Sequence, residues 1–136
     1  MQITNFQDLL NAAAQQSEPQ RLLMVFAAAT LPEHATPEQR ARFEAGQGGE
    51  LTPLICVDKL PQEIASFAAL VLEAARFGPD WQIVFVTSMS GRPGLAPSSE
   101  QADAALKGMV ESIKAGQLDA FIAFNRQGEP VRLHAS

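Results

Sequence analysis

The chain has 136 residues, of which 46% are hydrophobic and 18% are charged, and its net charge is −5. This length and composition predict one globular domain over 1–136 and exclude an intrinsically disordered chain. The 15 acidic and 10 basic residues include no basic cluster, which disfavours nucleic acid and anionic membranes as partners, because both bind clustered positive charge.

The first half of the chain predicts two helices and two strands. Capping-box spacing, from Thr4 to Gln7 and from Thr36 to Gln39, marks the beginning of each helix. Continuous apolar runs with branched residues indicate buried strands. These signals predict a helix over about 5–16, a strand over 21–29, a short helix from Pro37 to the glycines of 46–49, and a strand over roughly 53–58.

The second half begins with a long predicted helix from Pro61 to Phe77, which Gly78 and Pro79 close. Its apolar residues form two stripes, so we expect most of it to be buried, against a sheet and a partner chain. The remaining predicted elements are a strand over 81–89, a helix from Ser99 to Ala115, and two strands joined by a turn through 125–129.

This order, α-β-α-β-α-β-α-β-β, predicts an α/β or α+β domain with two or three layers. Alternating strands and helices favour parallel strand neighbours. We therefore expect a mixed sheet of about five strands with an antiparallel C-terminal hairpin.

The predicted location is the cytoplasm. The first ten residues lack the basic and apolar regions of a signal peptide, and no apolar stretch is long enough to cross a bilayer. The single cysteine cannot form an intrachain disulfide, which is typical of a reducing compartment.

Three features are candidates for reactive chemistry. The glycines of 46–49 follow a helix and precede a strand, the reverse of a phosphate-binding loop, so we interpret them as a helix cap and connection. Cys56 lies in an apolar strand and is expected in the core; the alternative is a redox-sensitive thiol near His34. The only other histidine, His134, gives no zinc-ligand spacing, so neither a metal nor another cofactor is predicted.

The most specific site hypothesis concerns the ends of the strands, because ligands of open parallel sheets bind at the carboxyl ends. Arg92 and the N-terminus of the helix after it together predict binding of a small anion. The alternatives are a solvated loop around Arg92 and a surface ion pair between Asp58 and Lys59. No nucleophile, base and acid come together, so no catalytic residue is predicted. The predicted ligand-binding residues are Asp58, Lys59, Ser88, Ser90, Arg92 and Ser98.

Three stretches, RLLMVFAAATLP, ATPEQRARFEAGQGGELTPLICVDK and FIAFNRQGEPVRL, resemble a small proteobacterial family of uncharacterised proteins, over nearly the whole chain. Members of that family are sometimes labelled ribonucleotide reductase subunit alpha. That subunit is several times longer and needs a radical cysteine as well as a redox-active cysteine pair, whereas this chain has one cysteine. We interpret the label as an error, and the resemblance implies no catalytic residues.

The favoured function is therefore a binding, regulatory or protein-interaction domain without catalytic activity. The apolar long helix and the C-terminal hairpin offer surfaces for a second copy, so a homodimer is one expected partner. The alternative is an enzyme or binding protein for a small anionic molecule at the strand ends.

Overall fold

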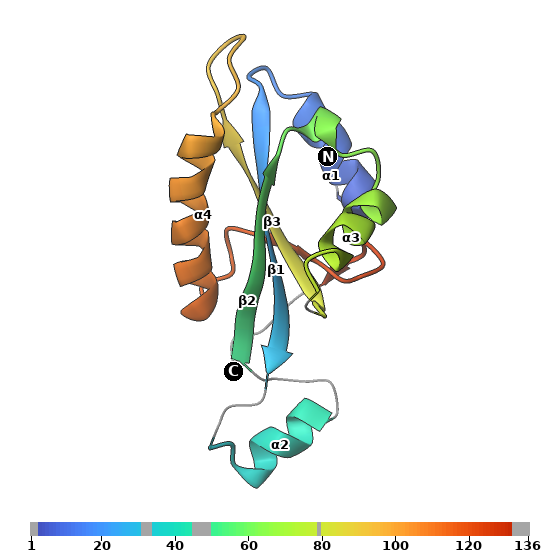
Figure 1. The fold of residues 1–136 in the computed structure, drawn as a ribbon, viewed down its shortest axis with the longest axis vertical. Coiled ribbons are helices and arrows are strands. Elements are labelled where there is room, and N and C mark those ends of the chain that lie inside the picture. Colours follow the sequence, from blue (N-terminus) through green and yellow to red (C-terminus); the bar gives the residue numbers. More distant parts are fainter. Residues whose placement is uncertain (1–2, 31–33, 45–49, 79, 132–136) are drawn as a thin grey trace.

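The computed structural model describes residues 3–30, 34–44, 50–78 and 80–131 (Figure 1). In chain order its elements are α1 (Phe6–Ala14), β1 (Gln20–Thr30), α2 (Pro37–Glu44), β2 (Glu50–Lys59), the 3₁₀-helix η1 (Pro61–Glu63), α3 (Phe67–Ala75), β3 (Ile83–Ser90), α4 (Ser99–Lys114), β4 (Ile122–Phe124) and β5 (Pro130–Val131). The predicted glycine loop 46–49 and His134 lie outside the described residues.

The five strands form one antiparallel sheet in the order β2-β1-β3-β4-β5. The predicted mixed sheet with parallel neighbours is therefore wrong, and the fold is α+β. Parallel neighbours need a crossover that covers a sheet face, but α2 is polar and lies apart from both faces (Figure 1). The chain therefore returns directly beside β1, with Thr30 opposite Glu50.

Helices lie on both faces of this sheet (Figure 1). α1 and α3 cover one face, where Phe6, Trp81 and Phe124 belong to the same buried cluster. α4 covers the other face, where Phe85 and Ile113 belong to a second buried cluster. β1 contributes to both clusters because alternate strand residues point to opposite faces.

Helix caps set the local boundaries. The Thr36–Gln39 capping box is confirmed, since each side chain bonds the other residue's backbone N–H. At α1 the predicted Thr4 cap is wrong: the Asn5 side chain accepts the bond from the backbone N–H of Asp8 at 2.8 Å. Asparagine is one of the strongest N-cap residues, so the helix begins one residue later than Thr4 would place it.

The predicted long helix over 61–77 is wrong, because it divides into η1 and α3. Ile64 is extended between them, with φ −104° and ψ 105°, and only 7% of it is exposed. The Ser66 hydroxyl then accepts a bond from the backbone N–H of Ala69 at 3.0 Å and caps a new helix. Within the single chain α3 is buried on one side only: Leu70 is buried, whereas Leu72 is 69% exposed.

The antiparallel C-terminal hairpin is confirmed by the pairing of β4 with β5. Its turn uses Gly128 at φ +79°, a conformation that favours glycine. The Gly128 carbonyl accepts a bond from the backbone N–H of Phe6 at 3.1 Å, which ties the turn to the beginning of α1.

Candidate functional site

The antiparallel sheet still brings the strand ends of the predicted site to one end of the molecule. β2 and β3 both run opposite to β1, so both end where β1 begins. Ser90 lies opposite Gln20, and Lys59 lies opposite Leu22. The alternation of side chains, however, divides the predicted residues between the two faces of the sheet.

Asp58 lies on the face covered by α4 and is held by two elements. Its carboxylate accepts bonds from Arg21 Nη1 at 2.7 Å and from Ser99 Oγ at 3.0 Å. Arg21 also donates from Nε to the carbonyl oxygen of Pro97 at 2.7 Å. An arginine and the first residue of α4 thus hold an anion here, but the arginine is Arg21, not the predicted Arg92, and the anion is the chain's own Asp58 carboxylate.

The other charged residues of the predicted site lie elsewhere. Lys59 is on the opposite face, where its Nζ is 3.0 Å from Glu73 Oε1. Arg92 is exposed in the loop before α4 and makes backbone bonds with Leu95. Among the described residues, no hydrogen bond or ion pair joins the Arg92 side chain to the rest of the predicted site. Ser98 caps α4 by accepting a bond from the backbone N–H of Gln101.

Ser88 and Ser90 line a cavity of about 340 Å³ between α1 and the sheet. Gln20 is only 5% exposed there, and its amide donates to Ser90 Oγ at 2.9 Å and to the carbonyl oxygen of Glu18 at 3.0 Å. No charged side chain of the described ranges lines this cavity. It favours an uncharged ligand over the predicted anion, because buried charge needs a charged partner.

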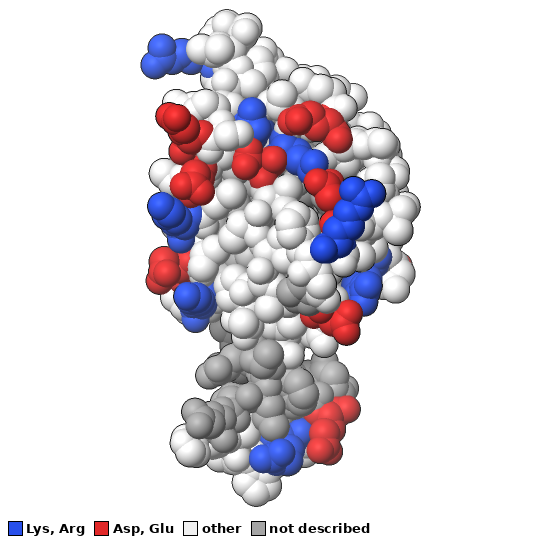
Figure 2. Space-filling view, viewed as in Figure 1, with Lys and Arg blue, Asp and Glu red and all other residues white. Residues whose placement is uncertain are grey.

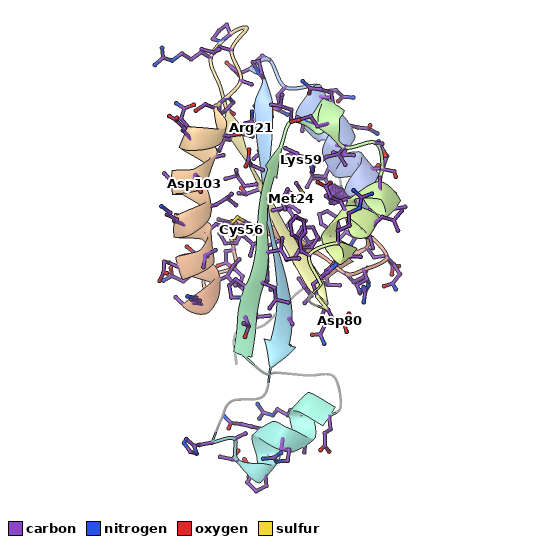
Figure 3. The ribbon with its side chains drawn as sticks, viewed as in Figure 1. Arg21, Met24, Cys56, Lys59, Asp80 and Asp103 are labelled. Carbon is purple, nitrogen blue, oxygen red and sulfur yellow. The ribbon has the colours of Figure 1, made fainter. Side chains whose placement is uncertain are left out.

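Cys56 is exposed, so the prediction of a buried core thiol is wrong. Cys56 belongs to β2, an edge strand whose only neighbour among the described strands is β1, and it lies opposite Val25 of β1. Figure 3 shows Cys56 on the α4 side of β2, below Asp103 in the view. Partial burial of the thiol by its surroundings, and secondly the negative charge of Asp103, raise the pKa of Cys56. A reactive thiol needs the opposite shift.

The outer edge of β2 and one flank of α4 share the face shown in Figure 2. The β2 residues 51–57 are uncharged, and the middle of this face is an uncharged area between charged side chains on its left and right. One flank of α4 carries a row that we call the α4 charged stripe. Its spacing of three or four residues places its members on one side of the helix. They are Glu100, Asp103, Lys107, Glu111 and Lys114.

The roles of Gln20 and Arg21 at this end of the sheet were not predicted from the sequence. Both are polar residues at the beginning of an apolar strand. That signal gains meaning only in an antiparallel sheet, where the beginning of one strand adjoins the ends of its neighbours.

Within the described ranges, no group of three or more His, Cys, Asp or Glu residues is placed to hold a metal ion. None of the described helices is long and apolar enough to cross a membrane. Comparisons of the chain with protein-family models, curated proteins and solved structures find no significant match.

Proposed function

We propose that the protein is a non-catalytic interaction domain that works as a homodimer, with the β2 edge and the α4 charged stripe as the interface. The observation that carries this proposal is that the stripe complements itself. In an antiparallel pair of α4 helices centred near Met109, Lys107 faces Glu111 of the second copy. Asp103 then lies within one residue of the position opposite Lys114 of the second copy, and twofold symmetry repeats both unlike pairs.

The β2 edge supports the same symmetry axis. The bond from Ser99 to Asp58 places the beginning of α4 beside the end of β2. The centre of the stripe lies about 14 Å along the helix from Ser99. That distance corresponds to about four strand residues before Asp58, near Leu54. Leu54 is in the middle of β2, so one twofold axis centres both the helix stripe and the strand edge.

Pro53 limits how the two edges meet. Proline has no backbone N–H, and the β1–β2 register shifts at this point. Hydrogen bonds between two β2 edges therefore form on either side of Pro53 and not through it. Such a proline also protects an exposed edge from open-ended pairing, which favours a closed dimer over a fibre.

The exposed area is consistent with self-association. The chain exposes 8401 Å², whereas a folded monomer of 14.6 kDa is expected to expose about 6,900 Å². The projecting α2 accounts for part of this difference (Figure 1).

The test is sedimentation velocity of the wild type and of Lys107→Glu over a range of concentrations. The substitution turns two attractive contacts of the dimer into repulsive ones, so we expect its dissociation constant to rise about tenfold or more. High salt should weaken the wild-type dimer in the same direction.

Two controls define the surface. Arg92→Glu makes the same charge change on an exposed loop and should leave the dimer unchanged. Leu72→Glu tests the exposed side of α3, one of the two surfaces that the sequence predicts for a second copy. A monomeric wild type contradicts the dimer; dissociation by Leu72→Glu but not by Lys107→Glu contradicts the β2–α4 interface.

The other expectations from the sequence stay predictions. They are the cytoplasmic location, the resemblance to the proteobacterial family, and a small anionic ligand at the strand ends. Of the residues predicted to bind that anion, Asp58 is already paired with Arg21.

A further inference from the structure

We propose that the outer edge of β3, beside α1, binds an extended uncharged segment of a partner protein, which joins the sheet as an additional strand. This site is independent of the proposed homodimer, because β2 and β3 flank opposite sides of β1. The two proposals can therefore fail separately.

The backbone pattern identifies which groups of β3 face outward. Gly91 donates its N–H to the carbonyl oxygen of Pro19, so these two residues form a hydrogen-bonded pair. In an antiparallel sheet hydrogen-bonded and non-hydrogen-bonded pairs alternate, so Met89 and Thr87 of β3 form their backbone bonds with β1. The N–H and C=O groups of Ser88 and Ser90 must then point to the other edge of β3.

The hairpin gives the same alternation independently. Asn125 donates its N–H to the carbonyl oxygen of Glu129. Ile122 and Phe124 are therefore the β4 residues that bond β3, where they lie opposite Val86 and Val84. The pairing of β3 with each of its two neighbours thus shows that the backbone N–H and C=O groups of its even-numbered residues point away from β1.

β4 stops before it reaches Ser88 and Ser90. Its pairing with β3 covers only Val84 to Val86. The chain before β4 turns away, with a bond from the backbone N–H of Phe121 to the carbonyl oxygen of Leu118. In the described part of the chain, the two serines therefore leave two backbone donors and two acceptors on an open edge, which is the requirement for strand addition.

The cavity beside this edge supplies the specificity. Ser88 and Ser90 line it together with Leu9 and Ala12 of α1, and its volume of about 340 Å³ suits a side chain of the added strand. Its polar wall is the Gln20 amide, which Ser90 and the Glu18 carbonyl hold in place. With no charged residue among the described ones that line it, the site selects an apolar or amide-bearing side chain.

The probe is a library of N-acetylated, C-amidated hexapeptides built from Ala, Val, Leu, Ser, Thr and Gln, selected on the full chain. The tightest binder is then methylated at one backbone nitrogen at a time. A peptide that adds as a strand should lose affinity about tenfold at alternate positions and change little at those between, because only alternate amides face β3.

Two alanines of α1 provide a matched pair of variants. Ala12 lines this cavity, whereas Ala14 lines only the neighbouring cavity between α1 and η1. Ala12→Leu should therefore block the peptide, and Ala14→Leu should not.

Four results would each overturn the proposal. They are the absence of any binder, a methylation profile without alternation, equal losses in the two alanine variants, and binding of acetyl-valine-amide as tightly as the hexapeptide. The last result would mean that the cavity takes a small neutral molecule and that no strand forms.

Discussion

At the scale of single residues, the ion pair of Asp58 and Arg21 shows how the strand ends are held. The two side chains are 24% and 13% exposed and lie 2.7 Å apart. Asp58→Asn would leave the mostly buried Arg21 guanidinium without its counter-charge. We expect the free energy of unfolding to fall by about 2 kcal/mol in urea denaturation.

The matched control is Asp119→Asn, an exposed aspartate in the loop after α4, which should change stability by less than about 0.5 kcal/mol. Equal effects of the two substitutions would mean that the Asp58 contacts add nothing to stability.

Cys56 gives a prediction about pH. Asp103 is the second cause of its raised pKa, after burial, so Asp103→Asn should shift the pH profile of iodoacetamide alkylation to lower pH. Because the folded-state pKa is raised, the thiol contributes stability that is fully present below its ordinary pKa and is lost as pH rises through the folded-state pKa. An unchanged alkylation profile in dilute protein would remove Asp103 as a cause.

Neither the exposure of Cys56 nor the contact between Asp58 and Arg21 could be predicted from the sequence. The apolar neighbours of Cys56 indicate a strand, but its exposure depends on β2 being the outermost strand, which is a property of the whole sheet. Asp58 and Arg21 are 37 positions apart, and their contact follows from the antiparallel pairing of β1 with β2.

At the scale of elements, local signals were predictable and long-range ones were not. The predicted capping box at Thr36 is confirmed, because both partners lie within one turn of helix. Ser98 and Gln101 form a second capping box at α4, which was not predicted from the sequence. The direction of strand pairing was wrong, because a short helix between two strands does not by itself show that it crosses a sheet face. The break at Ile64 was missed for a similar reason: burial of Ile64 competes with helix formation.

Two glycine substitutions test the backbone assignments of the elements. Gly128→Ala should destabilise the fold by about 1–2 kcal/mol, since φ is +79° and the added methyl would lie 3.1 Å from Phe67 Cδ2. Gly108→Ala should stabilise it by about 0.5–1 kcal/mol, since this helical position has no described atom within 4 Å of the added methyl. Thermal unfolding of both variants measures whether each substitution raises or lowers stability. A loss of stability in Gly108→Ala would contradict the prediction for that position.

At the scale of the whole molecule, the two proposals place other chains at two different edges of the sheet. The β2 edge is long, uncharged in its middle and flanked by the α4 charged stripe. The outer edge of β3 is short and lies beside a cavity with no charged residue among its described lining. We propose that the first edge binds a second copy and that the second binds an uncharged segment of another protein.

The most direct test of the homodimer is to mix two variants that each fail to pair. In Lys107→Glu, two glutamates face each other at both contacts of the dimer. In Glu111→Lys, two lysines face each other at the same contacts. Sedimentation velocity should therefore give a mass near 14.6 kDa for each variant alone. An equimolar mixture should restore a species of twice that mass, because the glutamate introduced at position 107 of one variant then faces the lysine introduced at position 111 of the other. A mixture that stays monomeric while the wild type dimerises would contradict the proposed interface.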